Sequence, residues 1–365
     1  MTAETVSAAQ GNAMQAAISC AIPALEPFND AVGHARLADE LGYDSIMLSH
    51  IAARDSFTMA AALAMRTQRV AIGTSVAPLY HRSPASMAQT AATVDDISGG
   101  RFRLGLGVGH RITMGGWHGQ QIGKPTAEMR EYIGIVRAIL AGDVPPTGQR
   151  WTSNFSFMGL TPRPDIPIYQ AALSPAMLRL AGEIADGVVL WACPSQYVRD
   201  VVVPEVAAGR DRAGRPLEGF HILAAVPSAM THDRATALAG VRNELHRYFG
   251  LPFYRAMFQA AGFAGDVAAF DAASSDVDAQ KLAISERFID RLCAIGDDVA
   301  VHDGVQRYRD AGVTNPVLTA ILGTDFEPTL RAAAVLEPSA TRGGRRDRRG
   351  LCSTIKNPDP PVENQ

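Results

Sequence analysis

Two histidines stand at positions where this chain could carry out proton chemistry. His50 follows the apolar run 45–48, and His110 follows the glycine-rich run 102–109. An imidazole titrates near neutral pH, so it can give a proton to a reacting centre or take one from it. We therefore take His50 and His110 as candidate catalytic residues. The alternative for His50 is a residue that only packs and hydrogen-bonds a neighbour.

The glycines before His110 have the spacing of a possible nucleotide-binding motif. Gly105, Gly107 and Gly109 alternate with other residues, but His110 takes the place of the third glycine of a dinucleotide fingerprint. No helix is expected to begin at His110, which also disfavours that fingerprint. The glycines are instead expected to end a strand and to let the backbone approach a flat ligand. The alternative is that they serve barrel packing alone.

An anion could bind where Ser174 and Pro175 predict the start of a helix. Serine is a frequent N-cap, and proline is favoured in the first turn. The free N–H groups and the helix dipole favour negative charge at such an end, for example a phosphate. The alternative is an ordinary capped helix.

These candidates follow short apolar segments that alternate with helical patterns. Eight such segments are expected to be strands: 16–22, 44–49, 69–76, 102–108, 167–173, 187–191, 220–226 and 315–321. Alternation of this kind predicts parallel strands joined by right-handed crossovers. Eight units closing on themselves make an α/β fold of the (β/α)8 TIM barrel type, whose active sites gather at the carboxyl ends of the strands.

The expected domain organisation has three parts. Residues 1–15 are a flexible N-terminus, 16–335 are the barrel catalytic domain, and 336–365 are a disordered basic tail that can be deleted without effect. A helical insertion at about 241–295 separates the seventh and eighth strands. Within it, 251–263 is either a packed helix pair or a wall of the substrate pocket.

The composition indicates which kinds of binding partner to expect. The net charge of −3 indicates no nucleic-acid or membrane surface, and no apolar run reaches the ~20 residues of a membrane span. The start lacks a secretory signal, and the four cysteines form no CxxC pair, so a cytoplasmic protein without a metal site is expected. The expected partners are a small-molecule substrate and a second copy of the chain in a homodimer.

Several ordered motifs carry a resemblance to a known family. They occupy 42–50, 73–78, 98–109, 170–175, 180–188 and 311–318. Together they resemble the luciferase-like monooxygenase superfamily, in particular its deazaflavin (coenzyme F420) branch near methylenetetrahydromethanopterin reductase. The resemblance covers residues 16–335.

The resemblance implies a cofactor ring lying over the barrel mouth. It places His50 beside the ring, a cis peptide between Ser75 and Val76 beneath it, and the fourth-strand wall at Gly107, Val108 and Gly109. The cofactor phosphate is expected at Ala172, Leu173 and Ser174. Two departures leave the substrate open: Ser49 stands where such proteins often have an acidic residue, and His110 stands where some have a catalytic carboxylate.

The implied activity is hydride transfer between coenzyme F420 and a small organic substrate. A deazaflavin is a two-electron carrier, so the protein need only align donor and acceptor. The alternatives are a reduced-FMN-dependent monooxygenase and a non-catalytic flavin-binding barrel. The first is preferred because Ser75–Val76 and 251–263 resemble the deazaflavin branch.

Overall fold

The strands close into a parallel barrel, as predicted. The computed structural model describes residues 17–334, so the expectations for 1–15 and 336–365 lie outside the described residues. The barrel strands are β1 (Ser19–Ala21), β2 (Ser45–Leu48), β3 (Ala71–Thr74), β5 (Phe102–Gly107), β6 (Ile168–Ala171), β7 (Gly187–Leu190), β8 (His221–Met230) and β10 (Asn315–Ala320). β10 pairs in parallel with β8 on one side and with β1 on the other, which closes the barrel.

Two short strands lie outside the predicted set. β4 (Ala77–Pro78) pairs with the end of β5, and β9 (Ala294–Gly296) pairs with the end of β8. Segments of two and three residues are too short to show a strand pattern in the sequence.

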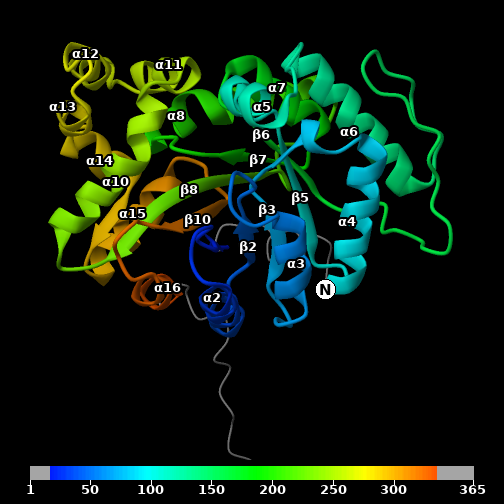
Figure 1. Cartoon of the computed structure of the whole chain (residues 1–365), viewed down its shortest axis with the longest axis horizontal. Helices are drawn as coiled ribbons and strands as arrows, with labels where there is room; N and C mark the ends of the chain where they lie inside the picture. The colour runs from blue at the N-terminus through cyan, green and yellow to red at the C-terminus, as the bar shows by residue number, and fades with distance from the viewer. Residues whose placement is uncertain (1–16, 335–365) are drawn as a thin grey trace, which may run out of the picture.

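The crossover helices surround the barrel (Figure 1). They are α2 (Phe28–Leu41), α3 (Ser56–Ala64), α4 (Pro84–Ser98), α6 (Pro125–Ala141), α7 (Pro175–Ile184), α9 (Val203–Arg212), α15 (Asp298–Asp310) and α16 (Glu327–Ala334). Local signals set their ends: Ser83 Oγ accepts from the Ser86 N–H at 3.2 Å, and Gly42 ends α2 with φ of 83°.

One sequence-based expectation about the helices is wrong. α5 (Arg111–His118) begins directly after His110, where no helix was expected. Its two consecutive glycines disfavour a helix by about 1 kcal/mol each relative to alanine. Packing overrides this preference, because Met114 is buried against Gly109 and Gly119 ends the helix with φ of 63°.

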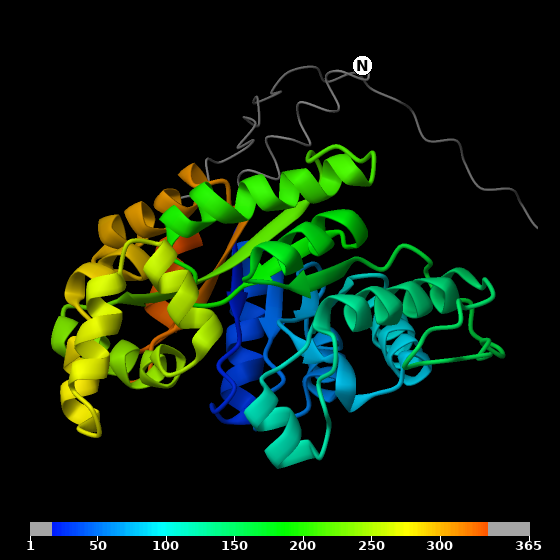
Figure 2. The ribbon, with the colours of Figure 1, turned by 90° about the horizontal axis from the view of Figure 1, so that it is seen from above.

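The insertion after β8 is a group of five helices. α10 (Arg234–Phe249) begins before the expected boundary at 241, and four shorter helices follow it: α11 (Pro252–Ala260), α12 (Ala264–Ala272), α13 (Val277–Ala283) and α14 (Glu286–Leu292). They lie together on one side of the barrel, opposite segment 142–167 (Figures 1 and 2). Phe249, Phe258 and Phe288 pack ring against ring at their centre, so the insertion has an apolar core of its own.

Side chains fill the barrel interior. Met47, Tyr169, Leu223 and Val317 form one buried cluster inside it. Toward the amino ends of the strands, Arg103 donates to Asp44 at 3.0 Å, and Asn315 donates to the same carboxylate at 2.6 Å. The interior is therefore a packed core, which leaves a functional site to the carboxyl ends of the strands.

Candidate active site

The predicted site segments all follow strands of one parallel sheet, so they emerge at the same end of the barrel, here called the mouth. Val76, Gly107 and Ala171 lie close together at the mouth, where three neighbouring strands end. A Cβ added to Gly107 would lie 2.5 Å from Val76 Cγ2 and 3.4 Å from Ala171 Cβ. The end of β5 thus touches both its neighbours, and only a glycine leaves room for Val76 there.

The peptide between Ser75 and Val76 is cis, which confirms the prediction from the resemblance. It lies where β3 stops and β4 begins. Thr74 anchors this break to β5, because its Oγ1 donates to Gly105 O at 2.7 Å and accepts from Gly105 N at 2.9 Å.

His50 is half-buried and held by groups close to it in the chain. The Ser56 N–H donates to His50 Nδ1 at 3.3 Å, and Ser56 Oγ lies 2.9 Å from the same nitrogen. In the neutral ring Nδ1 is therefore the acceptor, and the proton is on Nε2. Burial lowers the pKa of His50, Asp55 opposes this shift, and the nearby Arg82 and His118 add to it.

Asp55 supplies the negative charge on this side of the mouth. Its carboxylate caps α3 through the Thr58 N–H and accepts from Arg82 at 2.8 Å. Burial alone would raise the pKa of Asp55, but the hydrogen bonds from Thr58 and Arg82 lower it to about 2. Asp55 Oδ2 lies 3.8 Å from His50 Nδ1, so a fixed anion stands beside the imidazole at neutral pH.

Two further histidines extend from His50 in a row. The ring centroids of His50 and His81 are 5.2 Å apart, and those of His81 and His118 are 4.0 Å apart. His81 Nε2 is buried without a hydrogen-bond partner in the described part of the chain. Burial, with His118 and His50 next in importance, lowers the pKa of His81 to about 4. His81, the middle histidine of the row, is therefore neutral at pH 7.

His110 lies in a different, aromatic environment. Its ring centroid is 5.9 Å from that of Tyr254 and 6.4 Å from that of Tyr248, and the Tyr248 ring lies 5.8 Å from Trp191. α10 and α11 of the insertion therefore reach the mouth. The packing alternative for 251–263 is confirmed, since Phe258 of α11 packs on Phe249 of α10. The alternative of a substrate-pocket wall stays a prediction, which the approach of Tyr254 to His110 supports.

Two charged residues of α10 accompany this aromatic group. Arg247 is exposed and donates to Tyr248 Oη at 3.0 Å. Burial lowers the pKa of His110, and the positive charge of Arg247 lowers it further. Burial also raises the pKa of Glu244 to about 7, against the opposing effect of Arg247. Glu244 can therefore exchange a proton near neutral pH.

The loop expected to hold a phosphate leads directly into α7. Ala172, Leu173 and Ser174 precede Pro175, and Tyr197 Oη donates to Leu173 O at 2.9 Å, which fixes the loop. Ser174 is at the N-cap position, but its hydroxyl makes no capping hydrogen bond. The first N–H groups of α7 therefore stay available to an anion.

The mouth contains residues that sequence reasoning did not assign to it. His81 and His118 are not among the predicted site residues, although the position of His81 shortly after the third strand is a signal that could have found it. Glu244, Arg247 and Tyr248 had no signal, because nothing local in α10 shows which part of the barrel it crosses. Among residues 17–334, no group of three or more His, Cys, Asp or Glu side chains is placed to bind a metal.

Comparison with known proteins agrees with this geometry. Residues 3–315 match the luciferase-like monooxygenase family, so the chain belongs to that family. It is 32% identical over 315 residues to a proposed coenzyme F420-dependent oxidoreductase of Mycobacterium tuberculosis, an alignment covering 79% of this chain and 90% of that protein. It is 33% identical over 216 residues to a 5,10-methylenetetrahydromethanopterin reductase of Archaeoglobus fulgidus, covering 57% and 63% of the two chains.

A solved structure shares the fold. The coenzyme F420-dependent tetrahydromethanopterin reductase of Methanopyrus kandleri superposes with a TM-score of 0.72 at 22% identity, over 87% of this chain and 97% of that one. In the described part of the chain, no helix combines the length and apolar character that crossing a bilayer requires.

Proposed function

We propose that this chain is a coenzyme F420-dependent oxidoreductase that transfers hydride between the deazaflavin and a small organic substrate. The observation that carries the proposal is the 32% identity to a proposed coenzyme F420-dependent oxidoreductase along 90% of that protein's length. When bound, the deazaflavin supplies a two-electron carrier for hydride.

The residues at the mouth suit such a cofactor. Val76, backed by Gly107, offers an apolar support for a flat ring, and the free N–H groups of α7 suit a phosphate. His81 Nε2, buried and unpartnered within residues 17–334, is a polar atom that a bound ring could satisfy. The proposed cofactor-binding residues are His50, Ser75, Val76, Gly107, Val108, Gly109, Ala172, Leu173 and Ser174.

His50 is the proposed proton donor and acceptor. The hydrogen bond from the Ser56 N–H fixes the ring orientation, and Asp55 stabilises the imidazolium that forms when Nδ1 takes up a proton. The imidazolium then gives its Nε2 proton to the reacting centre and returns to a neutral ring. His110 is the second candidate for this role, on the aromatic side of the mouth. The rings of Tyr248 and Tyr254 exclude water from His110 and are proposed to contact the organic reactant.

A reduced-FMN-dependent monooxygenase is the second candidate, because the matched family is itself named for monooxygenases. The third candidate, a non-catalytic barrel, would bind a flavin but turn nothing over. We also propose that the chain works in the cytoplasm as a homodimer.

Cofactor titration separates these candidates. Purified protein is titrated with coenzyme F420 and with FMN, following the fluorescence of each, and oxygen uptake is then measured with reduced FMN. We expect coenzyme F420 to bind at least tenfold more tightly than FMN, with no oxygen uptake. Tighter FMN binding with oxygen uptake would support the monooxygenase instead. A panel of small alcohols and carbonyl compounds, followed by deazaflavin absorbance, then identifies the reactant and tests turnover.

A substitution at Ser174 tests the phosphate position. Ser174→Asp places a negative charge at the N-terminus of α7, and we expect cofactor affinity to fall about tenfold or more with the melting temperature unchanged. Ser174→Ala is the matched control, since it removes the hydroxyl without adding charge, and should change affinity little. Equal affinity in all three proteins would place the phosphate elsewhere.

A further inference from the structure

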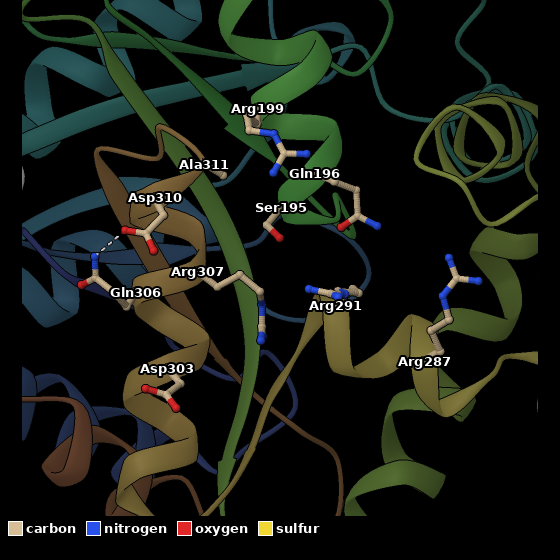
Figure 3. A pocket seen from close by; sticks show the side chains of 10 residues that line it. All are labelled: Ser195, Gln196, Arg199, Arg287, Arg291, Asp303, Gln306, Arg307, Asp310 and Ala311. Atoms are coloured by element: carbon tan, nitrogen blue, oxygen red, sulfur yellow. Dashed lines mark hydrogen bonds between the residues drawn. The ribbon is translucent and has the colours of Figure 1, made fainter.

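A second hollow lies on the outside of the barrel, between α15, α14 and the helix that follows β7 (Figure 3). Its volume is about 590 Å³, within the range of small-molecule sites. We call it the arginine groove, because Arg199, Arg287, Arg291 and Arg307 line it. α8 (Ser195–Tyr197) separates it from the mouth: Ser195 lines the groove, whereas Tyr197 holds the loop at Leu173.

The guanidinium groups of the groove are poorly neutralised. Within residues 17–334, Arg287, Arg291 and Arg307 make no ion pair, and only Arg199 pairs with a carboxylate, that of its neighbour Asp200. The Arg287 guanidinium instead lies 5.2 Å from the centre of the Phe263 ring.

Arg307 is held by a hydrogen bond and is partly buried, which distinguishes the groove from a surface with exposed, mobile charges. Its Nη2 donates to Cys293 O at 2.7 Å, which ties the side chain of this α15 residue to the end of α14. Its Nε is buried and has no hydrogen-bond partner in the described residues. A buried charged donor without an acceptor is costly, and an anion paired with the Arg307 guanidinium would offset part of that cost.

The opposite wall has an unusual backbone. η2 (Val198–Val202) is a π-helical turn between α8 and α9, and it carries Arg199. Turns of this kind are rare and are often found at functional sites. In Figure 3, Arg199 comes from this wall, Arg287 and Arg291 from α14, and Arg307 from α15, so three elements contribute guanidinium groups.

Two carboxylates reduce the positive charge of the groove. Asp303 and Asp310 also line the groove, and Asp310 accepts from Gln306 at 2.7 Å. With Asp200, which pairs with Arg199, three aspartates stand against the four arginines. One positive charge is left in surplus, and it attracts an anion. Arginine forks match the geometry of both carboxylates and phosphates.

We propose that the arginine groove binds a small polyanion, a molecule carrying two or more phosphate or carboxylate groups. The spread of the guanidinium groups over three elements requires several anionic groups to engage them, and the volume accommodates such a molecule. This site is separate from the proposed cofactor site and does not depend on it.

Calorimetric titration of the full chain tests the proposal, with inorganic pyrophosphate as one probe and citrate as the other. We expect one equivalent of at least one probe to bind the wild-type protein, and the tighter probe identifies the anionic group. Arg291→Gln should weaken binding at least tenfold. Arg36→Gln is the matched control, because it removes the same charge from an exposed position on α2.

Three outcomes would overturn the proposal. One is no binding of either probe at millimolar concentration. Another is equal weakening by Arg291→Gln and Arg36→Gln, which would indicate attraction to the overall charge. The third is a loss of binding in Ser174→Asp but not in Arg291→Gln, which would place the anion at α7. Equal melting temperatures of the variants exclude a folding defect as the cause.

Discussion

The two sides of the mouth hold their histidines in different ways. On the β2–β3 side, His50 is fixed by Ser56 and Asp55, a few residues along the chain, through hydrogen bonds and charge. On the β5 side, His110 is surrounded by Tyr248 and Tyr254, which come from the insertion. Hydrogen bonds and charge, as around His50, set the protonation of an imidazole. Aromatic rings supplied by an insertion, as around His110, can differ between relatives that act on different reactants. This difference is why we propose proton transfer at His50 and reactant contact around His110.

The largest expected effect comes from replacing His50. His50→Asn keeps much of the size and hydrogen bonding but removes the titratable group. General acid–base work contributes about 100-fold or more, so turnover should fall by that order while cofactor affinity changes little. Steady-state turnover and cofactor titration measure the two quantities.

His110→Asn is the matched variant for this comparison and should lower turnover much less. If it lowers turnover about 100-fold and His50→Asn lowers only cofactor affinity, the roles are reversed: His110 transfers the proton and His50 packs against the ring.

The contact between Val76 and Gly107 at the mouth should respond to added bulk. Gly107→Ala forces Val76 to shift, because the new Cβ would lie 2.5 Å from Val76 Cγ2. Overpacking costs about 1–3 kcal/mol, so we expect cofactor affinity to fall about tenfold if the ring rests on Val76. In Gly116→Ala the new Cβ meets nothing within 4 Å, so this control should bind normally. Unchanged affinity in Gly107→Ala would remove Val76 from the cofactor site.

The two sides should also titrate independently. Arg247→Gln removes a positive charge that lowers the pKa of His110, so this pKa should rise while that of His50 stays constant. Arg82→Gln should raise the pKa of His50 and leave that of His110 constant, because Arg82 lowers the pKa of His50. NMR titration of the two imidazoles measures both. A variant that moves both pKa values would show that the sides are electrostatically coupled.

The smallest expected effect is on stability, and it can be measured at His81 on the His50 side. Burial lowers the pKa of His81 from 6.5 to about 4, so between these pH values the unfolded chain binds a proton that the folded chain does not. This contribution to stability is complete above pH 6.5 and is lost as the pH falls toward 4. Melting temperatures of His81→Gln should therefore depend less on pH across this window than those of wild type. The exposed His232→Gln is the control, and an equal slope in all three proteins would contradict the assignment.

Local patterns were sufficient to predict the barrel and the place of its mouth. The eight strand segments, the cap at Ser83 and the helix start at Pro175 each depend on residues a few positions apart. A residue that directly follows a buried parallel strand emerges at its carboxyl end, so His50 and His110 could be placed at the mouth before their neighbours were known. The cis peptide at Ser75–Val76 followed from the family resemblance and not from the residues alone.

Only the tertiary structure decided what surrounds those positions. α5 formed despite its glycines because Met114 is buried, and no local preference reveals that burial. Three contacts join residues that lie far enough apart in the sequence to show no shared local pattern: His81 with His118, Tyr248 with His110, and Arg291 with Arg307 in the arginine groove. Strand and helix periodicity is a property of neighbouring residues, whereas these contacts depend on the path that the insertion and the mouth loops take across the barrel.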